Sequence, residues 1–78
     1  MNVAQSLGPI FRQVFELAAT ADVDQLAYRG LPAWDSVGHM RLVAALEDAF
    51  DIMLETEDVI DLSSFAKAVE IVRRYLGD

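Results

Sequence analysis

The sequence contains no cysteine among its 78 residues. This absence excludes disulfides, thiolate metal sites and a cysteine nucleophile, so any thiol chemistry needs a group supplied from outside the chain. No apolar run approaches the ~20 residues of a membrane-spanning helix, and the first residues lack a basic segment followed by an apolar one. We therefore expect a cytoplasmic protein that has no membrane partner.

Basic residues are few, with 6 Lys and Arg against 13 Asp and Glu, and the net charge of −7 disfavours nucleic acid as a partner. Residues 35–61 hold eight of the acids and a single base, Arg41, so the excess negative charge lies there. This segment fits an acidic docking surface for basic partner proteins. It fits equally well a set of helix faces whose charge keeps a small domain soluble.

Proline and glycine are also scarce, at two and four residues, and no repeat or low-complexity tract indicates disorder. Hydrophobic residues make up 54% of the sequence, which is enough for a compact core. We expect one domain spanning 1–78 and a monomer. A domain of this size buries only somewhat more than roughly 60% of its unfolded surface, so its stability margin should be thin.

Apolar residues recur at three- and four-residue spacing, which predicts helices, and no segment alternates as a strand would. The expected helices are one from near 6–9 to near 19–21, one over 36–50, a short one capped by Thr56, and one from the 62–64 turn to Gly77. The pattern of the first can be extended back to Val3. We therefore predict an all-α fold with three main helices and one short helix, and a long loop over 22–33 that is pinned to the core.

The stretch WDSVGHM at 34–40 marks the start of the second expected helix and contains the main candidate residue, Ser36. Asp35 is a good N-cap residue and would leave Ser36 as the first residue of that helix. A serine there points outward, beside unpaired backbone N–H groups and the positive end of the helix dipole, which suits a phosphate group. We interpret Ser36 as an attachment point and not as a catalytic nucleophile. The alternative is an ordinary surface serine beside a helix cap.

His39, the only histidine, follows Ser36 by three residues on roughly the same helix face, so a Ser–His hydrolytic pair is another alternative. No third orienting group or oxyanion donor can be named for such a pair. We instead expect His39 and Arg41 to be partner contacts or solvent-facing residues. Asp22 and Asp24 suggest a calcium loop, but the required glycine and terminal glutamate are missing, so we expect no metal site in the protein.

The chain resembles acyl carrier proteins and related phosphopantetheine-binding carrier domains over nearly its whole length, from about residue 6 to 76. The most specific part is Asp35-Ser36 followed by an apolar residue. Further matches lie along the second helix and at the turn into the last one: Leu42, Val43, Ala45, Leu46, Glu47, Phe50, Asp51 and the run Leu62 to Phe65. The resemblance implies a small four-helix bundle of the acyl-carrier-protein type.

The resemblance also implies that a separate phosphopantetheinyl transferase attaches 4′-phosphopantetheine from coenzyme A to Ser36. Asp35 would assist by helping to hold a magnesium ion, because a bare carboxylate repels an incoming pyrophosphate. An acyl or aminoacyl group would travel as a thioester on the thiol of the arm. The protein would be no enzyme, and its other partners would be a cargo-loading ligase or acyltransferase and downstream acceptor enzymes. The expected partner-binding residues are Arg41, Glu47, Asp48, Glu57 and Asp58.

The sequence departs from carriers of fatty acid synthesis after the serine and before the Asp-Ser pair. Where a leucine and then acids are usual, it has Val37, Gly38, His39 and Arg41, and Trp34 replaces the usual glycine. The Ser-apolar-Gly order resembles D-alanyl carrier proteins, so a specialised carrier, including an aminoacyl type, is favoured. An unmodified helical adaptor that binds one partner through an apolar groove is the alternative from another class.

Two expectations concern packing around the second helix. Trp34 could contact the arm or a partner, but we favour a hydrophobic staple near His39 and Met40. The alanines of the second helix leave room for cargo inside the bundle, whereas the core can be filled by Phe11, Phe15, Phe50 and Phe65. We favour a filled core and a short or polar cargo.

Overall fold

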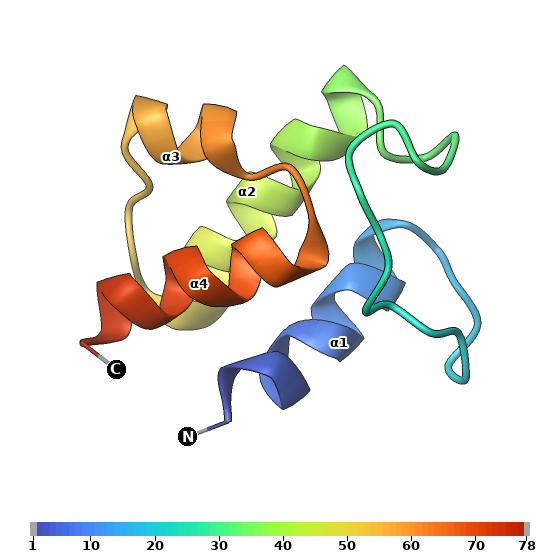
Figure 1. Ribbon diagram of the computed structural model, residues 1–78, viewed down its shortest axis with the longest axis horizontal. Coiled ribbons are helices and arrows are strands. Elements are labelled where there is room, and N and C mark those ends of the chain that lie inside the picture. The colour runs from blue at the N-terminus through green and yellow to red at the C-terminus, as the bar shows by residue number, and fades with distance from the viewer. Residues whose placement is uncertain (1, 78) are drawn as a thin grey trace.

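The computed structural model of the protein describes residues 2–77, and in that range its regular structure is helical (Figure 1). The helices are α1 (Val3–Val14), α2 (Ser36–Phe50), α3 (Thr56–Asp61) and α4 (Phe65–Leu76). No strand occurs among the described residues. Their β-type pairing is limited to an isolated antiparallel bridge between Ala27 and Ser64. The prediction of an all-α fold with three main helices and one short helix is confirmed.

Helix α1 begins earlier than predicted. It starts at Val3, because the side chain of Asn2 accepts a hydrogen bond from the backbone N–H of Gln5 at 3.1 Å and caps the first turn. Pro9 therefore lies inside the helix and not at its start. The predicted start near 6–9 is wrong, since the cap lies upstream of the Gly-Pro pair that suggested it.

Helix α1 also ends earlier, at Val14 and not near 19–21. Glu16 takes a left-handed conformation with φ of 55°, and the N–H of Leu17 bonds to the carbonyl of Arg12 at 2.8 Å. This is a Schellman ending, which usually has glycine at the left-handed position. With a glutamate there, the sequence gives no stop signal, and the apolar pattern running on to Ala18 misled the prediction.

Helix α2 has the predicted bounds. Asp35 lies in an extended conformation before it, and Asp51 closes it in a left-handed conformation with φ of 54°. The N–H of Asp51 bonds to the carbonyl of Glu47. The inward face of α2 is formed by Leu42, Val43 and Leu46, which are buried, whereas the apolar Val37 and Met40 near its start are exposed.

The ends of the last two helices follow the prediction in part. The cap of α3 is Glu55, without a side-chain hydrogen bond, and Thr56 is the first helical residue, so the predicted Thr56 cap is wrong. The hydroxyl of Ser64 accepts the N–H of Lys67 at 3.0 Å and caps α4. Gly77, with φ of 80°, ends α4 as predicted.

An aromatic cluster forms the centre of the core where α1, α4 and the start of α2 meet. The ring of Phe11 lies 4.9 Å from that of Phe65 and 5.5 Å from that of Trp34, and Phe15 lies 5.2 Å from Trp34, between ring centroids. The aliphatic residues that complete the buried core are Val3, Leu7, Val23, Leu42, Val43, Leu46, Leu62, Ala68, Ile71 and Val72. No helix in residues 2–77 has the length and apolar character needed to cross a membrane.

The long loop between α1 and α2 is pinned to the bundle at several points, as predicted. Its Val23 is buried, and the Arg12 guanidinium of α1 donates to the carbonyl of Ala21 at 2.9 Å. Further along, the N–H of Tyr28 bonds to the carbonyl of Ser63 at 2.9 Å. These contacts bring the loop past the turn into α4 and then to the start of α2.

Candidate functional site

Helix α2 starts at the edge of the molecule opposite the two chain ends (Figure 1). Ser36 is the first residue of this helix and is exposed. The Oδ1 atom of Asp35 accepts the N–H of Gly38 at 2.9 Å and fixes the first turn. This N–H, more than any other group, holds the pKa of the Asp35 carboxyl below its ordinary value of 3.8, and the charge of Arg29 acts in the same direction. A carboxylate that is ionised at neutral pH therefore adjoins the serine.

Gly38 lets the loop approach the first turn of α2 closely. A Cβ atom at this buried position would overlap the carbonyl oxygen of Ala33 and come within 3.3 Å of the ring of Phe15. Any other residue would push the loop and α2 apart. The glycine thus holds Ser36 in its place relative to the loop.

Tyr28 contacts Ser36 from the loop. The two hydroxyl oxygens lie 3.5 Å apart, and either one can be the donor. The guanidinium of Arg29 lies 5.6 Å from the centroid of the Tyr28 ring. The Ser36 hydroxyl, followed by Arg29, lowers the pKa of Tyr28 from its ordinary value of 10.0. The sequence carries no signal for this contact, because Tyr28 belongs to a segment without periodicity and nothing in its sequence context points to Ser36.

His39 is half-buried, not solvent-facing, and joins three parts of the chain. The indole N–H of Trp34 donates to its Nδ1 atom at 3.0 Å, and its Nε2 atom lies 2.7 Å from the carbonyl oxygen of Val59 in α3. An indole N–H can only donate and a carbonyl can only accept, so this pair of hydrogen bonds requires the imidazole proton to lie on Nε2 and leaves Nδ1 as the acceptor. Both ring nitrogens are engaged, which leaves neither available as a base for Ser36.

The staple predicted for Trp34 is confirmed in part. Trp34 precedes the cap of α2 and stacks on His39 at 6.3 Å between ring centroids, which is the residue pair that a hydrophobic staple joins. Met40 is 57% exposed and faces away from the core. Trp34 itself is fully buried, so it is a core residue and not a surface contact for the arm.

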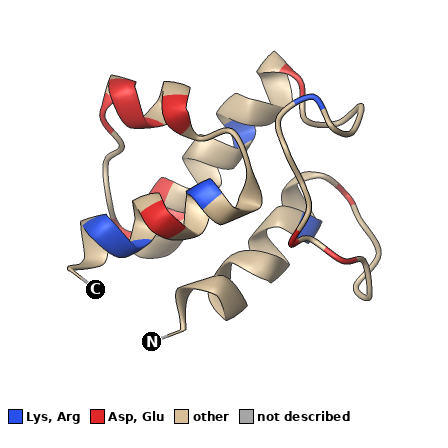
Figure 2. Ribbon diagram, viewed as in Figure 1, with Lys and Arg blue, Asp and Glu red and all other residues tan. Residues whose placement is uncertain are grey.

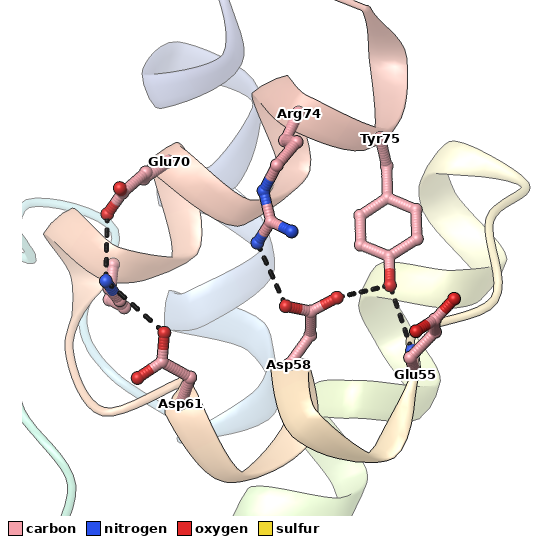
Figure 3. Close-up of polar contacts among 7 residues, drawn as sticks. Glu55, Asp58, Asp61, Glu70, Arg74 and Tyr75 are labelled. Atoms are coloured by element: carbon pink, nitrogen blue, oxygen red, sulfur yellow. Dashed lines mark hydrogen bonds and ion pairs between the residues drawn. The ribbon is translucent and has the colours of Figure 1, made fainter.

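Two of the five expected partner-binding residues are bonded within the chain. The Glu47 carboxylate accepts the N–H of Leu54 at 2.9 Å and braces the connection between α2 and α3. Asp58 accepts a hydrogen bond from Arg74 at 2.9 Å and another from the hydroxyl of Tyr75 (Figure 3). The remaining three expected residues are exposed on α2 and α3: Arg41, Asp48 and Glu57.

Part of the acidic segment is neutralised by α4. Figure 2 shows acidic positions along α3 and basic positions toward both ends of α4. Besides the Asp58 contacts, the Nζ atom of Lys67 forms ion pairs with a carboxylate oxygen of Asp61 at 3.3 Å and with one of Glu70 at 3.2 Å. The acidic segment was explained above as a docking surface or as charge that keeps the domain soluble. A third role is structural, because some of its carboxylates hold α3 to α4.

The helical bundle with an exposed serine at the start of α2 defines a carrier-type fold, and the comparisons bear this out. No model of a known protein family matches the sequence, and no curated protein matches it. Among solved structures, the chain is similar to the solution NMR structure of the holo acyl carrier protein from Geobacter metallireducens, with 28% identity and a TM-score of 0.85. The match covers 99% of this chain and 88% of that one. The resemblance to acyl carrier proteins is confirmed, and the match supports a carrier role.

Proposed function

We propose that the protein is a stand-alone carrier that receives 4′-phosphopantetheine on Ser36 and carries an acyl or aminoacyl group as a thioester on that arm. The main support is the exposed hydroxyl of Ser36, which opens α2 in a fold shared with a holo acyl carrier protein. The chain has no thiol of its own, so the arm supplies the one that a thioester needs. In this proposal the protein performs no reaction itself.

The modification is a phosphoryl transfer from coenzyme A. The Ser36 oxygen forms a bond to the phosphorus on the pantetheine side, the bond between the two phosphates breaks, and the nucleotide leaves. The serine proton passes to a base of the transferase. The ionised Asp35 carboxylate beside Ser36 is an oxygen ligand of the kind that magnesium prefers, so it can help to place the transferase's metal ion near the pyrophosphate.

Partner enzymes would meet the carrier around Ser36. Exposed charges on α2 and α3 (Arg41, Asp48 and Glu57) supply complementarity, and Val37 and Met40, 63% and 57% exposed, add apolar contact beside the serine. We propose a phosphopantetheinyl transferase, a cargo-loading ligase or acyltransferase and an acceptor enzyme as successive partners of a cytoplasmic monomer. Glu47 and Asp58 contribute less in this proposal, because their carboxylates are engaged inside the chain.

The choice between acyl and aminoacyl cargo does not follow from Gly38. The glycine in the Ser-apolar-Gly order suggested a D-alanyl type of carrier. Its close contact with the carbonyl of Ala33 explains why glycine is needed at this position, whatever cargo is carried. An aminoacyl carrier thus remains one form of the proposed function and gains no separate support.

Mass spectrometry tests the proposal directly. Purified protein is incubated with coenzyme A, magnesium and a broad-specificity transferase, and the intact masses of wild type and Ser36→Ala are compared. We expect a gain of one phosphopantetheine mass in wild type and none in Ser36→Ala. Ser63→Ala, which removes another exposed serine, is the matched control and should gain the same mass as wild type. An unmodified adaptor would gain nothing in any variant, and that result would end the proposal.

A further inference from the structure

A cleft opens beside Ser36 in the angle between α2 and α3. Its volume is about 250 Å³, and its lining is mostly apolar: Tyr28, His39, Val59, Ile60, Leu62 and Ser63. The cleft adjoins the attachment point, because Tyr28, which lines it, has its hydroxyl 3.5 Å from that of Ser36. A group carried on Ser36 would therefore meet the body of the protein here first.

His39 lines this cleft and is held by two hydrogen bonds and by contacts with two neighbouring rings. Hydrogen bonds of 3.0 and 2.7 Å join it to the Trp34 indole and to the Val59 carbonyl. The ring of Tyr28 packs edge-on against it, with 5.3 Å between centroids, while Trp34 stacks on it. The imidazole thereby ties α2 to α3 and contacts both the cleft and the buried indole of Trp34.

The space behind His39 is filled. Trp34 and Leu62 are 0% and 1% exposed, and the rings of Phe11 and Phe15 lie 5.5 and 5.2 Å from that of Trp34. An alkyl chain entering from the cleft would have to break both hydrogen bonds of His39 and displace closely packed rings. Packed interiors resist such an insertion, because extra methylene groups force neighbouring side chains out of their preferred rotamers.

We propose that His39 is a gate residue that limits the size of the carried group. A short acyl or aminoacyl group rests in the cleft, and a longer chain stays outside the bundle, within reach of partner enzymes. The cleft, at about 250 Å³, has room for such a short group, and the size limit comes from the closely packed rings behind His39. The inference deepens the carrier function proposed above and depends on it.

The test uses the whole protein loaded from coenzyme A, acetyl-coenzyme A or octanoyl-coenzyme A by a broad-specificity transferase. Intact mass comes first, and a failure to gain mass contradicts the carrier function without bearing on the gate. Thermal midpoints and backbone amide NMR shifts are then compared among the loaded forms. We expect the three midpoints to agree within about 2 °C and the shifts to be confined to the cleft.

A chain buried in the core would give the opposite result. Burial of the octanoyl methylene groups would raise the midpoint by more than about 10 °C. It would also shift the amides of Leu46 and Ala68, which are fully buried on α2 and α4. Either change in the loaded wild type overturns the proposal, whatever the variants do.

Two variants test the role of His39 itself. In His39→Ala we expect the octanoyl form to have a higher thermal midpoint than the same variant carrying phosphopantetheine alone, and we expect shifts of its core amides. The acetyl form of this variant should show neither change. Trp34→Phe removes the donor to His39 but keeps a ring, and should show a smaller effect in the same direction. Ala44→Ser, at an exposed position of α2, is the control and should respond as wild type does. A flat response to chain length in both His39→Ala and Trp34→Phe would exclude His39 as the gate.

Discussion

The start of α2 and the short helix α3 border the same cleft, yet different forces hold them. The start of α2 rests on buried aromatic rings through Trp34 and on the close approach at Gly38. In α3, described in full, no residue is buried, and polar contacts from Asp58 and Val59 fix it to α4 and α2. The position of Ser36 therefore depends mainly on packing, whereas that of α3 depends on hydrogen bonds and ion pairs together with the partly buried side chain of Val59.

This difference separates attachment from recognition. A hydroxyl that a transferase must find in one place benefits from a rigid base, which close packing provides. A surface that must fit several enzymes in turn benefits from a helix that has no buried residue and is held by a few polar contacts. We therefore expect variants at the base of α2 to destabilise the fold far more than variants on α3.

The largest effect should come from Trp34→Ala, which leaves a cavity among the core rings. We expect a loss of about 3–5 kcal/mol in the free energy of unfolding, measured by chemical denaturation with circular dichroism. Met53→Ala changes a residue that is 85% exposed and should alter stability by less than about 0.5 kcal/mol. Equal losses for the two variants would show that the base of α2 is not held by packing.

Gly38→Ala should have an intermediate effect. The added methyl group overlaps the carbonyl oxygen of Ala33, and relieving this overlap should cost about 1–3 kcal/mol. Because the loop and α2 must separate, modification of Ser36 by a transferase should also slow down. Val37→Ala, at the exposed neighbouring position, is the control for stability and should leave it nearly unchanged. A stable, normally modified Gly38→Ala would contradict the packing role given to this glycine.

The smallest effect should come from Asp58→Asn on α3, and it should depend on pH. The Tyr75 hydroxyl and then Arg74 hold the pKa of Asp58 below its ordinary value of 3.8, so its stabilising contribution is present at neutral pH and is lost as pH falls through the lowered pKa. Asp58 in turn raises the pKa of Tyr75 above 10.0, so the contribution of Tyr75 is lost as pH rises through the raised pKa.

The measurement is the difference in thermal midpoint between wild type and Asp58→Asn as a function of pH. We expect the difference to be largest between about pH 5 and 9 and to shrink at both extremes. Asp61→Asn, which removes a more exposed carboxylate on the same helix, should give a smaller difference. A difference that does not vary with pH would mean that Asp58 acts through packing, and the contrast between the two regions would fail.

The sequence predicted α2 and its serine because the relevant signals are local. Asp35 is a cap residue directly before an apolar-periodic run, and the structure places its carboxylate on the N–H of Gly38. The end of α4 could be predicted in the same way, since glycine, here Gly77, suits a left-handed helix ending. Such features need no knowledge of distant parts of the chain.

The contacts that the sequence could not reveal join residues far apart or use an unusual residue type. Tyr28 reaches Ser36 only because the loop is pinned to Ser63, and Asp58 meets Tyr75 only because α4 turns back beside α3. The end of α1 uses Glu16 in a conformation that favours glycine, so local preference pointed the wrong way.

The single tryptophan of the chain is also the residue on which the start of α2 rests. Its indole is shielded from water, bonded to one imidazole and stacked between rings. The intrinsic tryptophan fluorescence of the protein therefore reports on the environment at the base of the attachment point. Solvent reaching the indole would shift the emission to longer wavelength and weaken it, so the fluorescence reports any loss of packing beneath Ser36 without a dye.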